Sequence, residues 1–129
     1  MTGETGSYRF MAPEVFRHEG YGRPVDVYSF SLIFYQIKIG EPPWPTKTGP
    51  DAVRLAANTG ARPGLPRHWD ARLQKLLKAC WSADPALRPS FAAVLEVLNE
   101  AFKASVGDSY EEHIAKHGGS NGAGCCTIA

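Results

Sequence analysis

Residues 25–39 are apolar on almost every side of a helix, with the sequence VDVYSFSLIFYQIKI. Its polar residues are Asp26 at the start, followed by Ser29, Ser31, Gln36 and Lys38. The segment is longer than a typical strand, and it is shorter than the ~20 apolar residues that span a membrane. It therefore predicts a helix that is buried on most sides. Gly40 and the prolines at positions 42, 43 and 45 are expected to end it.

Four helices and no strand are expected along the chain. A proline followed by an aspartate favours a helix start at residues 49–58, and an apolar stripe predicts a helix at residues 69–81. Ser90 is a suitable N-cap for the last helix. Its inward face is expected to comprise Phe91, Val94, Leu95, Leu98 and Phe102. A short helical turn is also expected at residues 13–17.

Composition and charge exclude several classes of protein. The 129 residues suffice for one domain, and 43% of them are hydrophobic, which supports a packed core. A net charge of +1 with interspersed signs argues against nucleic-acid binding. We find no apolar segment of membrane-spanning length and no signal peptide. Three cysteines do not form a disulfide framework, so a reducing, cytoplasmic setting is expected.

Three separated segments carry recognisable motifs. They are MAPEVF at 11–16, PVDVYSFSLIFYQIKIGEPPW at 24–44 and CWSADPALRPSF at 80–91. In this order and spacing they resemble the end of the activation segment, the central helix and the closing motif of a protein kinase large lobe. The segment TGETGSYRFMAPEVF is most similar to the corresponding segment of Raf-like, tyrosine-kinase-like serine/threonine kinases of plant type.

The resemblance implies a mainly α fold, the helical C-lobe portion of the kinase fold without a small lobe. It covers residues 1–104 as a partial kinase domain. Residues 105–129 are polar and rich in glycine, and they are expected to form a flexible C-terminal tail.

The family's other motifs do not occur in the sequence. They are the G-x-G-x-x-G loop, the V-A-I-K lysine, H-R-D-L-x-x-x-N and D-F-G. In the family these parts hold ATP and magnesium and supply the catalytic aspartate. The resemblance thus implies part of a serine/threonine kinase that transfers the ATP γ-phosphoryl group to protein hydroxyls. The chain alone is expected to be inactive, with no catalytic residue, no metal and no bound cofactor.

The resemblance also assigns structural roles to three charged residues. Glu14 belongs to the A-P-E triplet and is expected to pair with Arg88 of the closing motif, which ties the activation segment to the lobe. Asp26 corresponds to the residue that anchors the backbone of the catalytic loop. An aspartate at a helix start also gains from the helix dipole, which requires no function.

Hydroxyl groups near the N-terminus match the activation segment. Ser7 occupies the position where serine/threonine kinases carry a hydroxyl that helps to seat the substrate, and Phe10 lies in the same segment. Thr2, Thr5 and Ser7 are candidate phosphorylation sites, because a phosphate there could order the loop against arginines.

The last four residues, CTIA, fit the C-a-a-X pattern for prenylation of Cys126. Cys125 is a candidate for a second lipid, although the tail has no polybasic segment. His113 and His117 precede the two cysteines, but adjacent cysteines lack zinc-site spacing, so solvated histidines are expected.

Two other hypotheses remain open beside the kinase fragment. The chain could be a non-catalytic, kinase-like regulatory module that presents the helix at 49–58 to protein partners. It could also be lipid-anchored through the C-a-a-X motif and so associate with membranes.

Overall fold

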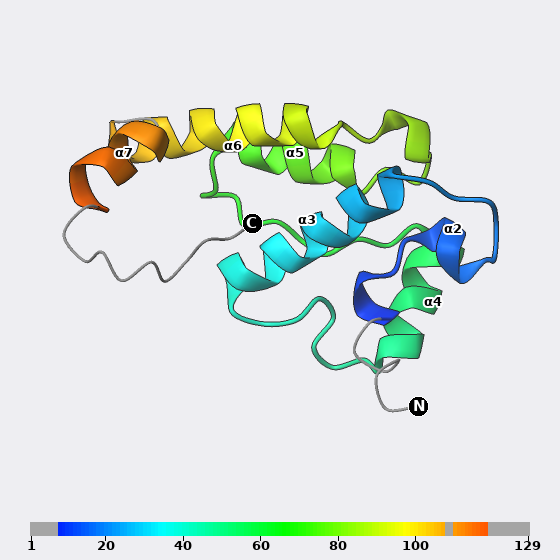
Figure 1. The fold of residues 1–129 in the computed structure, drawn as a ribbon. Helices are drawn as coiled ribbons and strands as arrows, with labels where there is room; N and C mark the ends of the chain where they lie inside the picture. The colour runs from blue at the N-terminus through cyan, green and yellow to red at the C-terminus, as the bar shows by residue number, and fades with distance from the viewer. Residues whose placement is uncertain (1–7, 108–109, 119–129) are drawn as a thin grey trace.

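The computed structural model describes residues 8–107 and 110–118 of the chain. Within these residues every regular element is helical, as the sequence predicts, and there is no strand (Figure 1). In chain order the elements are η1 (Tyr8–Phe10), α2 (Pro13–Phe16), α3 (Pro24–Ile39), α4 (Gly49–Thr59), α5 (Ala71–Cys80), η2 (Pro85–Leu87), α6 (Phe91–Val106) and α7 (Tyr110–His117).

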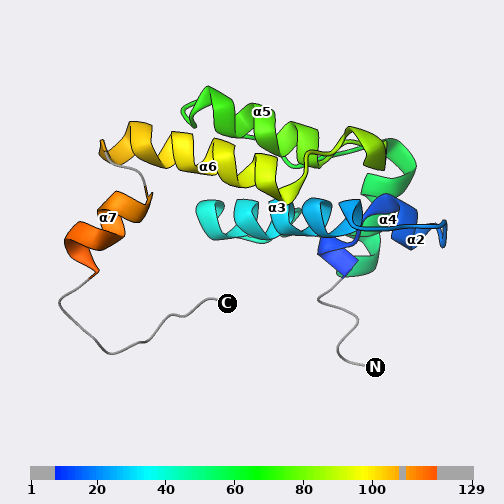
Figure 2. The ribbon, with the colours of Figure 1, turned by 45° about the horizontal axis from the view of Figure 1, so that its top comes forward.

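The helices are arranged around α3. Helices α5 and α6 lie side by side and cover one flank of α3 (Figures 1 and 2). A second group, comprising η1, α2 and α4, packs together at the N-terminal end of α3, and α7 lies beyond its other end. This arrangement brings the segment just after residue 7 next to the loop and helix that follow α3.

Local signals account for where the helices begin and end. Pro24 lies at the start of α3, and Gly40 ends it in the left-handed conformation at φ 88°. Thr48 and Ser90 cap α4 and α6, because their side chains accept hydrogen bonds from the backbone N–H groups of Asp51 and Ala93, both at 3.2 Å. The predicted N-cap at Ser90 is therefore confirmed.

The core is built on α3. Tyr28 and Leu32 are completely buried. They lie in one hydrophobic cluster with Leu77 and Cys80 of α5 and Val94 of α6. Tyr35 adds ring contacts to two tryptophans that flank α5, with its ring centroid 6.1 Å from that of Trp69 and 5.9 Å from that of Trp81. The predicted helix at 25–39 is thus confirmed and carries the core, but only Val27, Tyr28, Ser31 and Leu32 are buried in it, so the predicted burial on most sides is wrong.

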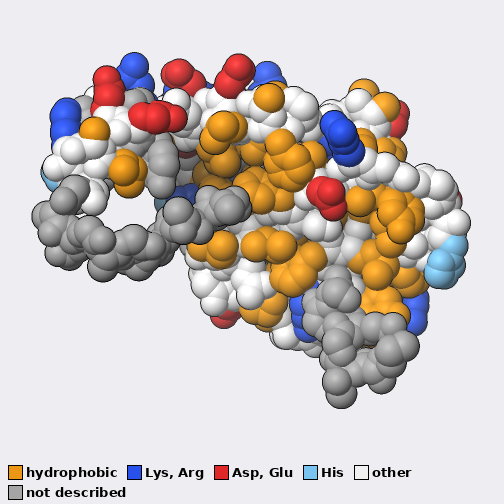
Figure 3. Space-filling view, in the orientation of Figure 1, with side chains coloured by type: hydrophobic (Ala, Val, Ile, Leu, Met, Phe, Trp, Pro, Cys, Tyr) orange, Lys and Arg blue, Asp and Glu red, His pale blue; other side chains and the backbone are white. Residues whose placement is uncertain are grey.

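One side of this arrangement is uncovered by the described residues. On α3, Ile33 and Ile37 are 45% and 78% exposed. On α6, Leu95 is 68% exposed, so its predicted inward orientation is wrong, whereas Phe91 is 47% exposed and packs edge-on against Phe30 of α3 with ring centroids 5.7 Å apart. Val94 and Leu98 face the core as predicted, together with Val97, which was not predicted. Figure 3 shows apolar side chains gathered on the face where α3 and α6 lie.

Helix α7 was not predicted, and α6 continues to Val106, past the boundary expected at residue 104. Gly107, in the left-handed conformation at φ 83°, separates the two helices. The first turn of α7 contains Glu111 and Glu112, and its last turn contains Lys116 and His117. This charge order suits the helix dipole and is a local signal for α7.

Candidate functional site

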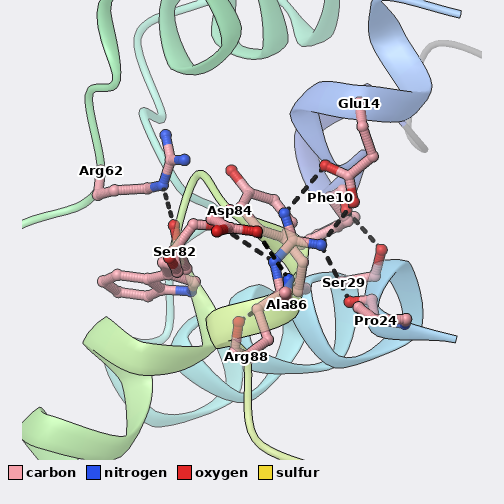
Figure 4. Close-up of polar contacts among 12 residues, drawn as sticks. Phe10, Glu14, Pro24, Ser29, Arg62, Ser82, Asp84, Ala86 and Arg88 are labelled. Atoms are coloured by element: carbon pink, nitrogen blue, oxygen red, sulfur yellow. Dashed lines mark hydrogen bonds and ion pairs between the residues drawn. The ribbon is translucent and has the colours of Figure 1, made fainter. Parts of the chain in front are cut away.

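Glu14 and Arg88 form a buried, bidentate ion pair (Figure 4). The two guanidinium NH groups of Arg88 donate to Oε1 and Oε2 of Glu14, with N–O distances of 2.5 and 2.9 Å. The exposed fraction is 0% for the Arg88 side chain and 4% for that of Glu14. The structure thus brings together two residues that the sequence analysis expected to pair.

Arg88 also connects two other parts of the chain. Its Nε donates to the carbonyl oxygen of Ser82, and one NH group donates to that of Pro24, both at 3.1 Å. Its guanidinium carbon lies 5.0 Å from the centroid of the Tyr28 ring. One buried side chain therefore links α2, the first turn of α3, and the end of α5.

The pKa of Glu14 lies below its ordinary value. Burial alone would raise the pKa, but hydrogen bonds from Arg88 and from the backbone, together with the charges of Arg88 and Arg17, more than offset that effect. The carboxylate is therefore held in its ionised form, as a buried pair with full hydrogen bonding requires.

A second arginine, Arg62, joins α4 to α5. Its Nε donates to the carbonyl oxygen of Trp81 at 2.8 Å, and one NH group donates to that of Ala56 at 3.1 Å. Its guanidinium carbon lies 5.3 Å from the centroid of the Tyr28 ring. Sequence reasoning missed Arg62, because a donor to distant main-chain carbonyls leaves no local pattern.

The short helix η1 is fixed by contacts from two directions. Ser29 on α3 donates its hydroxyl to the carbonyl oxygen of Phe10 at 2.6 Å (Figure 4). Arg9 donates to carbonyl oxygens in the loop between α3 and α4. Phe10 itself is partly buried against the core. Of the residues expected to seat a substrate, Phe10 is described, whereas Ser7 lies outside the described residues.

A cavity of about 400 Å³ lies beside η1. Tyr8, Met11, Val15 and Phe16 contribute its aromatic and aliphatic walls, and the remaining lining residues are His18, Glu19 and Tyr21. A cavity with this lining can hold an apolar side chain and offers polar groups at one side.

A larger cavity, of about 620 Å³, lies among α3, α5, α6 and α7. Its apolar lining includes Phe34, Leu73, Leu98 and Phe102, and Leu95 extends it towards the exposed face of α6. It lies apart from η1 and from the Glu14–Arg88 pair, neither of which lines it.

Asp26 lies in the first turn of α3 and is exposed. None of the described residues forms a hydrogen bond or ion pair with its side chain. This position suits the helix dipole. The family role as an anchor for the catalytic loop stays a prediction, because no H-R-D segment is present in this sequence.

Several predicted sites fall outside the described residues. These are the candidate phosphorylation sites Thr2, Thr5 and Ser7, and the candidate lipidation sites Cys125 and Cys126. Among the residues the structure describes, no group of three or more His, Cys, Asp or Glu side chains could hold a metal ion. No helix in that part of the chain is long and apolar enough to cross a membrane.

The comparisons with known proteins agree with the motifs. Residues 1–98 match the family described as protein tyrosine and serine/threonine kinase. The chain is 43% identical over 119 residues to the serine/threonine-protein kinase STY17 of Arabidopsis thaliana, covering 92% of this chain and 20% of that protein. It is 44% identical over 101 residues to the serine/threonine-protein kinase VIK of the same plant, covering 78% of this chain and 23% of that protein.

A third relative from Arabidopsis thaliana is the serine/threonine/tyrosine-protein kinase HT1. It is 37% identical over 98 residues, which are 76% of this chain and 25% of that protein. The chain thus spans about a fifth to a quarter of the length of these curated relatives.

Proposed function

Because this chain belongs to the family of protein tyrosine and serine/threonine kinases, we propose that it is the large-lobe part of an active serine/threonine kinase. The complete domain would transfer the γ-phosphoryl group of ATP to hydroxyl groups of protein substrates. In that domain the chain would supply the structural frame of the large lobe and part of the surface that binds the substrate.

The observation that carries this proposal is the buried Glu14–Arg88 pair. It fastens the segment after residue 7 to α3 and to the end of α5, through bonds at 2.5–3.1 Å. Phosphoryl transfer depends mainly on positioning, so a substrate-binding segment needs such a rigid attachment. A buried ion pair adds little stability compared with apolar side chains in the same place. Its directional hydrogen bonds instead hold the two segments that it joins in one relative position.

We assign the binding of the protein substrate to η1 and the 400 Å³ cavity beside it. Ser7 immediately precedes η1, and Tyr8 and Met11 line the cavity. An apolar side chain of the substrate would enter the cavity, and Ser7 would help to seat the acceptor hydroxyl, as the resemblance to the family implies. Phosphorylation of Thr2, Thr5 or Ser7 would then act directly on the segment that seats the substrate.

The residues of this chain do not fit a nucleotide and magnesium site. The sequence has no glycine-rich loop and no D-F-G motif, and the described residues include no cluster of potential metal ligands. The proposal therefore assigns ATP, magnesium and the catalytic aspartate to other segments of the domain. The chain alone should transfer no phosphate.

The size of the native polypeptide tests the proposal first. An immunoblot against the peptide SYEEHIAKHGGSNG should detect a band well above 14.1 kDa. The purified protein from that band should phosphorylate serine and threonine peptides, and the 129-residue chain should not. A sole band at 14.1 kDa, or a longer protein without kinase activity, would contradict the proposal.

The uncovered face favours a second function, that of a non-catalytic binding module. Ile37 and Leu95 are 78% and 68% exposed, and the 620 Å³ cavity is largely apolar. Such patches commonly bind partners or cause association. Size-exclusion chromatography with a hydrophobic dye tests this function, because a dye-silent monomer with a sharp melting transition would count against it.

A further inference from the structure

The loop between α3 and α4 satisfies few of its own backbone groups: within it, the N–H group of Lys47 donates to the carbonyl oxygen of Trp44 at 3.0 Å. Pro42, Pro43 and Pro45 have no N–H group, so residues 40–48 offer more carbonyl acceptors than donors. Trp44 adopts a φ of 48°, in the left-handed region that side chains other than glycine rarely occupy. A conformation of this kind persists when surrounding groups hold it.

Arg9 supplies further donors from η1, a segment 34 to 38 positions earlier in the sequence that packs beside this loop. One of its NH groups donates to the carbonyl oxygen of Pro43 at 2.9 Å and to that of Trp44 at 2.8 Å. The second NH group donates to the carbonyl oxygen of Lys47. The guanidinium group thus binds three carbonyl groups in the loop, including that of the residue with the positive φ.

These contacts fix η1 as well as the loop. Arg9 is the middle residue of η1, which α4 packs against, and the carbonyl of its neighbour Phe10 accepts from Ser29 at 2.6 Å. The helix is therefore held by α3 through Ser29 and by the proline-rich loop through Arg9. Removing Arg9 would leave one of these two attachments.

We propose that Arg9 is a positioning residue for the protein substrate, acting through its three bonds to the proline-rich loop. It holds η1, and with it the wall of the 400 Å³ cavity that Tyr8 and Met11 provide. This inference rests on the function proposed above. It adds that the conformation of the α3–α4 loop sets how well the substrate binds.

The test is steady-state kinetics of the full-length protein with Arg9→Gln and Arg9→Lys. A misplaced binding segment can cost up to about 100-fold, so Arg9→Gln should raise the peptide KM about tenfold, with the ATP KM unchanged within about twofold. Lysine carries a point charge instead of a planar group with several donors, so Arg9→Lys should raise the peptide KM less than Arg9→Gln but still above the wild-type value. Arg72→Gln is the matched control, because Arg72 is exposed on α5, away from the 400 Å³ cavity, and pairs with Asp70.

Hydrogen exchange on the same proteins separates this inference from the proposed function. Arg9→Gln should speed exchange in residues 8–16 and 43–48 together, and Arg72→Gln should not. If the wild-type protein has no kinase activity, the proposed function is wrong, and exchange alone decides whether Arg9 positions η1. Faster exchange confined to 43–48, or an unchanged peptide KM in an active enzyme, would overturn the inference.

Discussion

Glu14 and Arg88, 74 positions apart in the sequence, meet in a bidentate ion pair that solvent scarcely reaches. The pair closes the longest side-chain link found among the described residues around the site, from α2 to the segment that follows η2. Because Arg88 also binds the carbonyl groups of Pro24 and Ser82, the loss of Arg88 would loosen three segments at once.

We expect Glu14→Gln and Arg88→Met each to lower the free energy of unfolding by about 3–5 kcal/mol, since each leaves a buried group without its charged partner. The double variant should cost less than the sum of the two. Urea unfolding of the purified protein measures both effects. The exposed Arg54–Asp51 pair provides the control, and Arg54→Gln should cost below about 0.5 kcal/mol. Additive losses would show that the two residues do not act as a pair.

The lowered pKa of Glu14 predicts a loss of stability in acid. A carboxyl group whose pKa is lower in the folded state stabilises the fold above its unfolded pKa of about 4.3, and this stabilisation is lost as pH falls through the folded pKa. The wild-type urea midpoint should therefore fall more steeply below pH 4 than that of Glu14→Gln. The pKa of Asp70 is also lowered, to about 2, but Asp70 affects the pH dependence of stability equally in the wild type and in Glu14→Gln. If the urea midpoints of the two proteins fall in parallel as pH is lowered, the lowered pKa of Glu14 is contradicted.

Much of the fold was predictable because its signals are local. Pro24 and Gly40 bound the central helix, and Ser90 begins α6, through backbone conformations and caps that residue type alone specifies. The Glu14–Arg88 pair was predictable only through the resemblance to the kinase family, since neither residue carries a local signal for the other.

Other features depend on tertiary contacts that the sequence does not encode locally. Arg9 and Arg62 bind main-chain carbonyl groups, which every residue has, so no pattern identifies the partner. The orientation of Leu95 was wrong because the face of α6 that meets α3 depends on how the two helices cross. Helix α7 was missed because its polar composition is also typical of a flexible tail.

The exposed side of α3 should behave differently in the chain and in a longer kinase domain. In the 129-residue chain, Ile37→Glu should reduce dye binding and self-association, because the side chain is 78% exposed. In the full-length protein the same change should lower stability by about 1.5–3 kcal/mol, if the rest of the domain buries this position. Dye fluorescence and thermal unfolding measure the two effects.

Leu87→Glu is the control for that comparison, since Leu87 is 68% exposed and belongs to η2 rather than to α3. It should have a similar effect on both proteins. Full-length protein that tolerates Ile37→Glu without loss of stability would show that the face stays open, and would favour the binding module.

Tyr28 offers a test of the central packing. Its ring lies 5.3 Å from the guanidinium carbon of Arg62 and 5.0 Å from that of Arg88, and the side chain is fully buried. Its hydroxyl oxygen has no hydrogen-bond partner among the described residues. A buried, unpaired hydroxyl is unfavourable, so Tyr28→Phe should raise the free energy of unfolding by about 1 kcal/mol.

Tyr28→Leu should instead lower the free energy of unfolding by about 2–4 kcal/mol, because it removes both cation–π contacts and leaves a cavity in the core. Urea unfolding of the two variants separates the contribution of the ring from that of the hydroxyl. Arg88 and Arg62 together bind α2, α4 and the end of α5, and both guanidinium groups pack against the Tyr28 ring. A loss of more than about 1 kcal/mol in Tyr28→Phe would mean that the hydroxyl has a partner after all, and would overturn this account of the core.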